Sequence, residues 1–399
     1  MKQTPNINLP ILEQGDKYLK ETQNEAFSVI DREIAGLNSA ISVLDNVEGS
    51  IIDTKSDVET LKNETNTLKA SLNDMASNVI PNIQTSLDNI ETQVNGLNQL
   101  NNKFNGVNFF IGDVGSNYNL SQLTNIADEI LKTNIKDLFL VIYQNYDTNN
   151  NSLTLSNDIM LIQQVKDMLI QKGFNIIGYK FHVSNKVGLP INNTTWFEQY
   201  ENNILSVIDT IGNAGVTYCN LYNEFTDIAS NENFKNLFIS LNEKIKNRNF
   251  KTFHTNTITG AYSSKVLDIV DMIGVNMYPS VSDKGKHTTL EECIKAWYFS
   301  FDGAIESQKM IKSIKKRFNV PVVISEVGMP PVEEAFLNPE KYDYDLTNID
   351  YNHQALFLEG FFEAYKDFEF EGFFIWNSTS RMFSPFKDET TINLINKYI

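Results

Sequence analysis

The feature that most constrains the fold is an alternation of short apolar runs with amphipathic segments between residues 105 and 399. Eight runs rich in β-branched and aromatic residues indicate strands at 106–112, 137–143, 175–183, 216–223, 250–257, 271–278, 320–326 and 371–377. Segments with helical periodicity follow them, around 120–132, 158–172, 194–214, 233–248, 263–270, 290–318, 351–368 and 391–398. This order predicts a (β/α)8 TIM barrel over residues 105–399. A doubly wound open sheet is the alternative, but no glycine-rich phosphate fingerprint follows the first strand.

Residues 17–100 have a different texture, with isolated apolar residues among polar ones and a single proline, Pro81. Many of the apolar residues are spaced by three or four positions, as in the seam of a coiled coil. They are Ile30, Ile34, Leu37, Ile41, Leu44, Val58, Leu61, Leu68, Leu72, Met75, Val79, Ile83, Leu87, Ile90, Val94 and Leu97. Because one helix cannot bury such a seam alone, the pattern predicts a homo-oligomeric coiled-coil stalk over residues 31–100. A partly helical linker is the alternative, and Ile and Val in the seam favour a homotrimer over a dimer.

The composition argues against several classes of partner. The 399-residue chain carries a net charge of -17, whereas nucleic-acid binding requires clustered Lys and Arg, so no nucleic acid is expected. The two cysteines, Cys219 and Cys293, form neither a disulfide framework nor a zinc-type spacing. No signal peptide is evident, and no run approaches the roughly 18 apolar residues of a membrane span. Membrane insertion is therefore not expected.

The ends of the predicted strands supply the candidate site, because a (β/α)8 barrel builds its active site at the carboxyl ends of its strands. These positions hold Tyr143, His182, Asn223, Glu224, Asn256, Tyr278, Glu326 and Trp376. Amides and carboxylates bond sugar hydroxyls, and an aromatic ring packs on the face of a sugar. A neutral, hydroxyl-rich ligand is therefore predicted, with no cofactor.

The two carboxylates carry the sharpest hypothesis. Glu224 would end the fourth strand and Glu326 the seventh. Retaining glycosidases need two carboxyl groups about 5–5.5 Å apart, which these strands of one barrel can supply. Structural carboxylates paired with Lys or Arg are the alternative. His182 and His254 could instead ligate a metal, but neither an HxH pair nor an Asp-rich strand end accompanies them, so no metal site is predicted.

Several motifs resemble those of a known clan. The segments "YNEF", "MIGVNMYP", "PVVISEVG" and "FFIWN" resemble strands four, six, seven and eight of the retaining (β/α)8 glycoside hydrolases. Within that clan the chain is most similar to a bacterial endo-β-mannanase-like family, through "KFHV", "TWFEQY", "IVDMIGVNMYP", "VPVVISEVG" and "FSPFKDE" in order. The resemblance implies that Glu224 is the acid/base and Glu326 the nucleophile. It further implies that Asn223 holds the sugar 2-hydroxyl and Tyr278 positions Glu326, with Trp376 as the floor of the subsite and His182 as a donor.

Two departures from that family concern the sugar. The family typically has Thr before its acid/base Glu, whereas this chain has Asn223, the commoner residue across the clan. The sixth strand, "VNMYP", lacks the acidic residue and paired tyrosines often found there. The resemblance therefore implies a retaining glycosidase without implying mannan as its substrate.

The N-terminal segment "TPNINLPILEQGDKYLKETQNEAFSVIDREI" resembles the start of tail-fibre and baseplate proteins of phages that infect Gram-positive bacteria. This implies a virion attachment segment at residues 1–30, other tail or baseplate proteins as partners, and a location in the virion tail. The expected function is a tail-associated, endo-acting, retaining glycoside hydrolase that cleaves host cell-surface polysaccharide or wall glycan. A catalytically weak, receptor-binding protein and a metal-dependent phosphodiesterase acting on teichoic acid are the alternatives.

Overall fold

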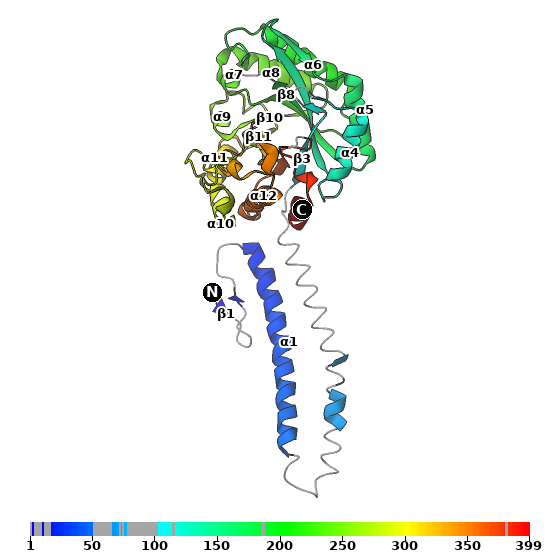
Figure 1. Cartoon of the computed structure of the whole chain (residues 1–399), viewed down its shortest axis with the longest axis vertical. Helices are drawn as coiled ribbons and strands as arrows, with labels where there is room; N and C mark the ends of the chain where they lie inside the picture. Colours follow the sequence, from blue (N-terminus) through cyan, green and yellow to red (C-terminus); the bar gives the residue numbers. More distant parts are fainter. Residues whose placement is uncertain are drawn as a thin grey trace. The chain divides into compact units, whose positions relative to one another are not determined.

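The chain divides into two compact units, Met1–Gln99 and Leu100–Ile399 (Figure 1). The computed structural model describes residues 2–3, 10–11, 17–50, 66–71, 73, 76–77, 103–113, 116–184, 188–379 and 382–399. Within this part of the chain, no helix combines the length and the apolar character that a bilayer crossing would need.

The described part of the first unit contains one long helix. Helix α1 (Lys17–Ser50) is uninterrupted, and β1 (Lys2–Gln3) pairs antiparallel with β2 (Pro10–Ile11). The helix covers the first five positions of the predicted seam, of which Ile41 is 45% exposed in the single chain. Most of the later seam positions lie outside the described residues, as does much of the predicted attachment segment. The oligomeric stalk, its trimeric state and the attachment role therefore stay predictions.

The second unit is a closed barrel of eight parallel strands, which confirms the predicted fold. In chain order the strands are β3 (Phe104–Phe110), β6 (Asp137–Asp147), β8 (Asn175–Ser184), β9 (Tyr218–Asn223), β10 (Lys251–Thr257), β11 (Met272–Asn276), β12 (Val322–Val327) and β13 (Gly372–Ile375). Each pairs in parallel with the next, and β3 pairs with both β6 and β13, which closes the barrel. The carboxyl ends of all eight strands therefore meet on one face.

Helices surround the strands (Figure 1). The main ones are α4 (Leu120–Ile130), α5 (Ile159–Gln171), α6 (Thr195–Ile211), α8 (Glu232–Lys246), α9 (Ile258–Ser263), α10 (Leu290–Ala296), α11 (Ser307–Phe318), α12 (Tyr351–Tyr365) and α13 (Glu389–Tyr398). Helix α4 illustrates why they form. Asn119 and Gln122 make a reciprocal capping box at its start, and its apolar stripe, including Leu123 and Ile130, is buried.

Three details differ from the elements predicted from sequence. Strand β6 runs on past residue 143 and pairs antiparallel with β7 (Ser152–Leu155), so the stretch expected to be loop contains a hairpin. The single helix predicted over 290–318 is two helices, α10 and α11. The helix predicted at 263–270 is wrong: α9 starts earlier because Thr257 caps it, accepting a hydrogen bond from the Gly260 amide. The apolar residues that suggested a helix after it, such as Val266 and Leu267, are buried in irregular structure.

The barrel interior is layered along the strands. Near the amino ends lies a cluster of apolar side chains, namely Phe104, Phe139, Tyr218, Phe253, Met272, Val323 and Phe374. Further along the same strands the buried side chains become polar, with Asn108, Lys180, Thr255, Asn276 and Ser325 almost inaccessible to solvent. Buried polar groups are costly unless they are hydrogen-bonded, so this polar layer is a specific feature of the interior. It lies toward the carboxyl ends of the strands, where (β/α)8 barrels have their active sites.

A substitution at Gly106 tests how closely β3 approaches β6 and β13 where the barrel closes. A Cβ atom there would lie 2.5 Å from the Phe374 ring and 2.7 Å from the Asp137 carbonyl oxygen, so it would press on both neighbouring strands. We expect Gly106→Ala to lower the free energy of unfolding by about 1–3 kcal/mol, the usual cost of overpacking. Urea titration followed by tryptophan fluorescence measures this, since Trp196, Trp297 and Trp376 all belong to the unit that holds the barrel.

Gly36→Ala is the matched control. Nothing lies within 4 Å of a Cβ atom at Gly36, which belongs to α1 in the other unit. The tryptophan transition of this variant should match that of the wild type. An unchanged transition in Gly106→Ala as well would contradict the close approach of β3 to β6 and β13.

Candidate active site

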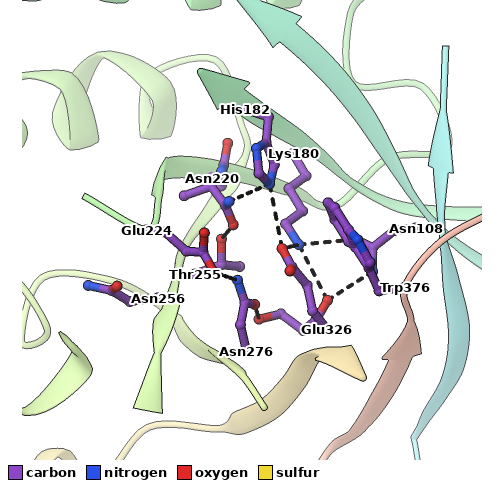
Figure 2. Close-up of polar contacts among 12 residues, drawn as sticks. Asn108, Lys180, His182, Asn220, Glu224, Thr255, Asn256, Asn276, Glu326 and Trp376 are labelled. Atoms are coloured by element: carbon purple, nitrogen blue, oxygen red, sulfur yellow. Dashed lines mark hydrogen bonds and ion pairs between the residues drawn. The ribbon is translucent and has the colours of Figure 1, made fainter. Parts of the chain in front are cut away.

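A cleft of about 770 Å³ opens at the carboxyl ends of the barrel strands. Its size is within the range of small-molecule and oligosaccharide sites. Of the residues predicted from sequence, the cleft lining includes Tyr143, His182, Glu224, Tyr278, Glu326 and Trp376. Both candidate carboxylates therefore face one cavity, and they reach it from β12 and from the end of β9 (Figure 2).

Glu326 is enclosed by hydrogen-bond donors on the floor of the cleft. Only 3% of the residue is exposed. Its Oε1 atom accepts a hydrogen bond from Lys180 Nζ at 2.6 Å, and its Oε2 atom accepts one from the Tyr278 hydroxyl at 2.9 Å. His182 Nε2 lies 3.5 Å from Oε1. A carboxylate held by a cation and a hydroxyl is fixed in one orientation.

Tyr278 remains a neutral donor in this arrangement. Burial in the cleft wall raises the pKa of its hydroxyl well above the ordinary range, and the adjacent Glu326 carboxylate raises it further. The proton therefore stays on the tyrosine at neutral pH, and the hydroxyl can donate to Glu326. This geometry agrees with the positioning role that the family resemblance implied for Tyr278.

Lys180 is the principal residue that the strand-end rule missed. It is fully buried, and besides Glu326 its Nζ atom donates to Asn108 Oδ1 at 3.1 Å and to the Ser325 carbonyl oxygen at 3.3 Å. The same ammonium lies 5.1 Å from the centre of the Trp376 ring. Lys180 is two residues before His182 on β8, so both side chains point into the barrel. That alternation was the available signal, because a lysine inside an apolar strand needs a buried partner.

Glu224 occupies a different environment. It follows the last residue of β9 with a backbone φ of 53°, which is uncommon for a residue other than glycine. Its amide donates to the Thr255 carbonyl oxygen at 2.8 Å, and its Oε1 atom accepts from Asn276 Nδ2 at 2.9 Å. Unlike Glu326, it is only half-buried. Left-handed backbone held in place by its surroundings is common at functional sites, where it aims a side chain out of its strand.

Asn276 was also missed by the sequence patterns. Its Oδ1 atom accepts a hydrogen bond from Ser325 Oγ at 2.6 Å, so its amide group is fixed and its Nδ2 atom points at Glu224. The Asn276 amide is a neutral donor to Glu224, whereas the donor to Glu326 is the charged ammonium group of Lys180. The two carboxyl groups thus differ in charge environment, which is the condition for dividing acid and nucleophile roles between them.

The remaining predicted residues have distinct positions. Asn223 is almost fully buried behind the cleft lining, with its amide nitrogen against His182 Nε2 and its amide oxygen accepting from Thr255 Oγ1. Asn256 lies apart from the two carboxylates in Figure 2, does not line the cleft, and has its Oδ1 atom bonded to Thr226 Oγ1 and the Thr257 amide, both at 2.9 Å.

Aromatic side chains form one wall of the cleft. Trp376 packs edge-on against Phe110 with ring centres 4.7 Å apart, and its indole N–H donates to the Tyr342 hydroxyl. Tyr143 contacts Phe110 at 5.5 Å and His182 at 5.2 Å between ring centres. Only 2% of Trp376 is exposed, so the indole forms a mostly buried part of the cleft wall.

Comparison with known proteins supports this chemistry. The sequence model of Glycoside Hydrolase Family 113 matches residues 179–393, more than half of the chain. The chain belongs to glycoside hydrolase family 113. It is a glycoside hydrolase, as the strand-end residues predicted. No curated protein matches this family 113 hydrolase.

Solved structures share its architecture at low identity. A GH113 β-1,4-mannanase is 14% identical with a TM-score of 0.59, covering 74% of this chain and 99% of that one. The GH113 β-mannanase of Alicyclobacillus acidocaldarius is 11% identical with a TM-score of 0.56, covering 74% and 96%. A family 5 mannosidase of Rhizomucor miehei is 13% identical with a TM-score of 0.51, covering 75% and 92%. At such identities the likeness establishes the barrel fold alone.

Lys180→Met tests the importance of the buried cation. Methionine has a similar length but leaves Glu326 without its charged partner. We expect kcat to fall by about 10²–10³-fold, the loss typical of removing one preorganised electrostatic contact. Release of reducing ends from a cleaved glycan measures it, with circular dichroism to verify folding.

Lys166→Met is the matched control, because Lys166 of α5 is also buried but donates to the Ile211 carbonyl oxygen at 2.7 Å, outside the cleft. It should retain the wild-type kcat even where it loses stability. Equal kcat values in the two folded variants would show that Lys180 does not act through Glu326.

Proposed function

We propose that this chain is a phage tail-associated, retaining glycoside hydrolase that cleaves polysaccharide on the surface of a Gram-positive host. The observation that carries the enzymatic part is the pair of carboxyl groups in one cleft with unlike surroundings. Glu326 is enclosed by Lys180 and Tyr278, whereas Glu224 is half-open and bonded by the Asn276 amide. Such a pair fits a double displacement.

In the first step the Glu326 carboxylate attacks the anomeric carbon and the bond to the leaving oxygen breaks. Glu224 gives its proton to that oxygen, so the departing sugar leaves as a neutral alcohol. In the second step Glu224 takes a proton from water, whose oxygen bonds the anomeric carbon and releases Glu326. Lys180 and Tyr278 hold Glu326 in place through both steps.

The substrate class follows from the lining of the cleft. Among the described residues, the charged groups of the lining are carboxylates, and the ammonium group of Lys180 beneath them already bonds Glu326, Asn108 and Ser325. A neutral, hydroxyl-rich glycan suits this lining. The solved family 113 neighbours are named β-mannanases, which makes β-1,4-mannan the first polymer to test. Asn223 in place of the family's usual Thr argues for including other glycans.

The tail association rests on the N-terminal resemblance and on the seam pattern. A trimeric stalk would present three catalytic units to one surface, and linked sites bind a repetitive polymer with gained avidity. The molecular mass of the full chain from analytical ultracentrifugation should then be three times the 45.5 kDa of the monomer.

Ile34→Asp should weaken this trimer by introducing charge into the seam of α1, and Arg32→Asp, at an exposed position of the same turn, should not. Analytical ultracentrifugation of the full chain distinguishes the two variants. A monomeric wild type would contradict the stalk.

The enzymatic proposal is tested on β-1,4-mannan and on purified surface polysaccharides of Gram-positive bacteria. Glu224→Gln and Glu326→Gln should each lower the release of reducing ends by at least about 10²–10⁴-fold, the range of general acid–base contributions. Glu369→Gln is the control, since that carboxylate is exposed and pairs with Lys315 just before β13, at the opposite end of the barrel.

A substrate with an activated leaving group distinguishes the acid role of Glu224 from the nucleophile role of Glu326. An aryl glycoside of the cleaved sugar with an acidic phenol needs no proton at departure, so its first step should be far less impaired in Glu224→Gln than in Glu326→Gln. If the wild type releases no reducing ends from any polymer while all variants bind equally, the chain is a receptor-binding protein and the enzymatic proposal fails.

A further inference from the structure

Asn223 directly precedes Glu224 in the chain, but its side chain is buried. Only 1% of the residue is exposed, and the described lining of the cleft does not include it. Its amide oxygen accepts a hydrogen bond from the Thr255 hydroxyl, and its amide nitrogen contacts His182 Nε2. Both polar atoms of the amide therefore have partners within the protein.

The Thr255 hydroxyl determines which way this amide faces. Thr255 belongs to β10, is fully buried, and directs its hydroxyl to Asn223 Oδ1. The hydroxyl has a single proton to donate, and the other acceptor near it, the Tyr222 carbonyl oxygen, lies farther away at 3.5 Å. Because the amide oxygen faces this donor, the amide nitrogen faces the imidazole, and an amide nitrogen can only donate.

The contact with the Asn223 amide decides where His182 carries its proton. In a neutral imidazole one ring nitrogen donates and the other accepts. Since the amide nitrogen donates, His182 Nε2 must accept, and the proton is left on Nδ1. A proton on Nε2 would bring two N–H donors into contact.

The groups around His182 make this constraint significant. Glu326 Oε1 lies 3.5 Å from His182 Nε2, and a carboxylate at that place favours a proton on the nitrogen (Figure 2). The Lys180 ammonium bonds the same oxygen at 2.6 Å and disfavours a second positive charge beside it. The Tyr143 ring packs on another side, with its centre 5.2 Å from that of the imidazole. The Asn223 amide thus opposes the pull of Glu326 on the proton.

We propose that Asn223 is a positioning residue for His182, and that with Thr255 it keeps the imidazole neutral and protonated on Nδ1. His182 lines the cleft, so a fixed proton settles which donor and acceptor its ring offers before a sugar binds. The catalytic consequence rests on the proposed function. The position of the proton can be measured without any substrate.

Magic-angle-spinning NMR of the full chain, labelled with ¹⁵N in histidine, reports which ring nitrogens carry protons. The chain has four histidines, and the signals that disappear in His182→Gln identify those of His182. At about pH 8 an ordinary histidine is neutral. We expect wild-type His182 to carry a proton on Nδ1 and none on Nε2. A wild-type proton on Nε2 would overturn the proposal.

Asn223→Asp is the main variant, because it keeps the shape of the side chain and replaces the N–H donor with an acceptor. We expect His182 Nε2 to become protonated. Thr255→Val, which removes the hydroxyl and keeps the volume, should let the Asn223 amide turn and give a mixture of the two forms. It provides the same test if Asn223→Asp does not fold. Unchanged His182 signals in the folded variants would contradict the assigned role.

Asn242→Asp is the matched control. Asn242 of α8 is also buried and its Oδ1 atom accepts from Thr252 Oγ1 at 2.6 Å, but its Nδ2 atom donates to the Ile269 carbonyl oxygen at 3.2 Å. Its His182 signals should match those of the wild type. A change as large as in Asn223→Asp would attribute the effect to a general loss of structure and overturn the proposal.

Cleavage kinetics test the consequence for the reaction. On a glycan that the wild type cleaves, Asn223→Asp should lower kcat/KM about five- to tenfold, the size expected for one displaced hydrogen bond. Asn242→Asp should keep the wild-type value. A wild-type kcat/KM in Asn223→Asp with Nε2 protonated would overturn the positioning role. If the wild type cleaves nothing, the enzymatic proposal fails alone, and the NMR result still decides where the proton lies.

Discussion

The buried ion pair between Lys180 and Glu326 is the interaction on which the rest of the cleft depends. Neither charge could remain in the barrel interior alone, because an unpaired buried ion costs several kcal/mol. The pair persists because Asn108, Ser325 and Tyr278 satisfy the remaining donors and acceptors. The outcome is a carboxylate that is oriented and placed in the lining of a cavity, as a nucleophile must be.

The second carboxyl group is held by opposite means. Glu224 itself has a left-handed backbone conformation, and its carboxyl group accepts a hydrogen bond from an amide instead of a cation. Asn276 and Tyr278 come from the end of β11 and the residues just after it, and each reaches a different carboxyl group. The end of β11 therefore positions both carboxyl groups. The apolar cluster near the amino ends of the strands packs the barrel interior beneath them.

Much of this architecture was predictable from the sequence, and the misses have physical reasons. Eight apolar runs and the strand-end rule located Glu224 and Glu326, because barrel topology brings strand ends together whatever the loops do. Lys180 was missed because the rule considers only strand ends, whereas its side chain reaches the site from within the strand. Asn256 was expected in the cleft from its place at a strand end. Its Oδ1 atom instead accepts hydrogen bonds from Thr226 Oγ1 and from the Thr257 amide, local contacts that periodicity does not reveal.

The stereochemistry of the first product tests the central claim most directly. Proton NMR of the glycan cleaved by the wild type, recorded before mutarotation, reports the anomeric configuration of the new reducing end. Double displacement through Glu326 predicts that this configuration equals that of the cleaved bond. A product of inverted configuration would contradict the assignment of Glu326 as nucleophile and of Glu224 as its acid/base partner.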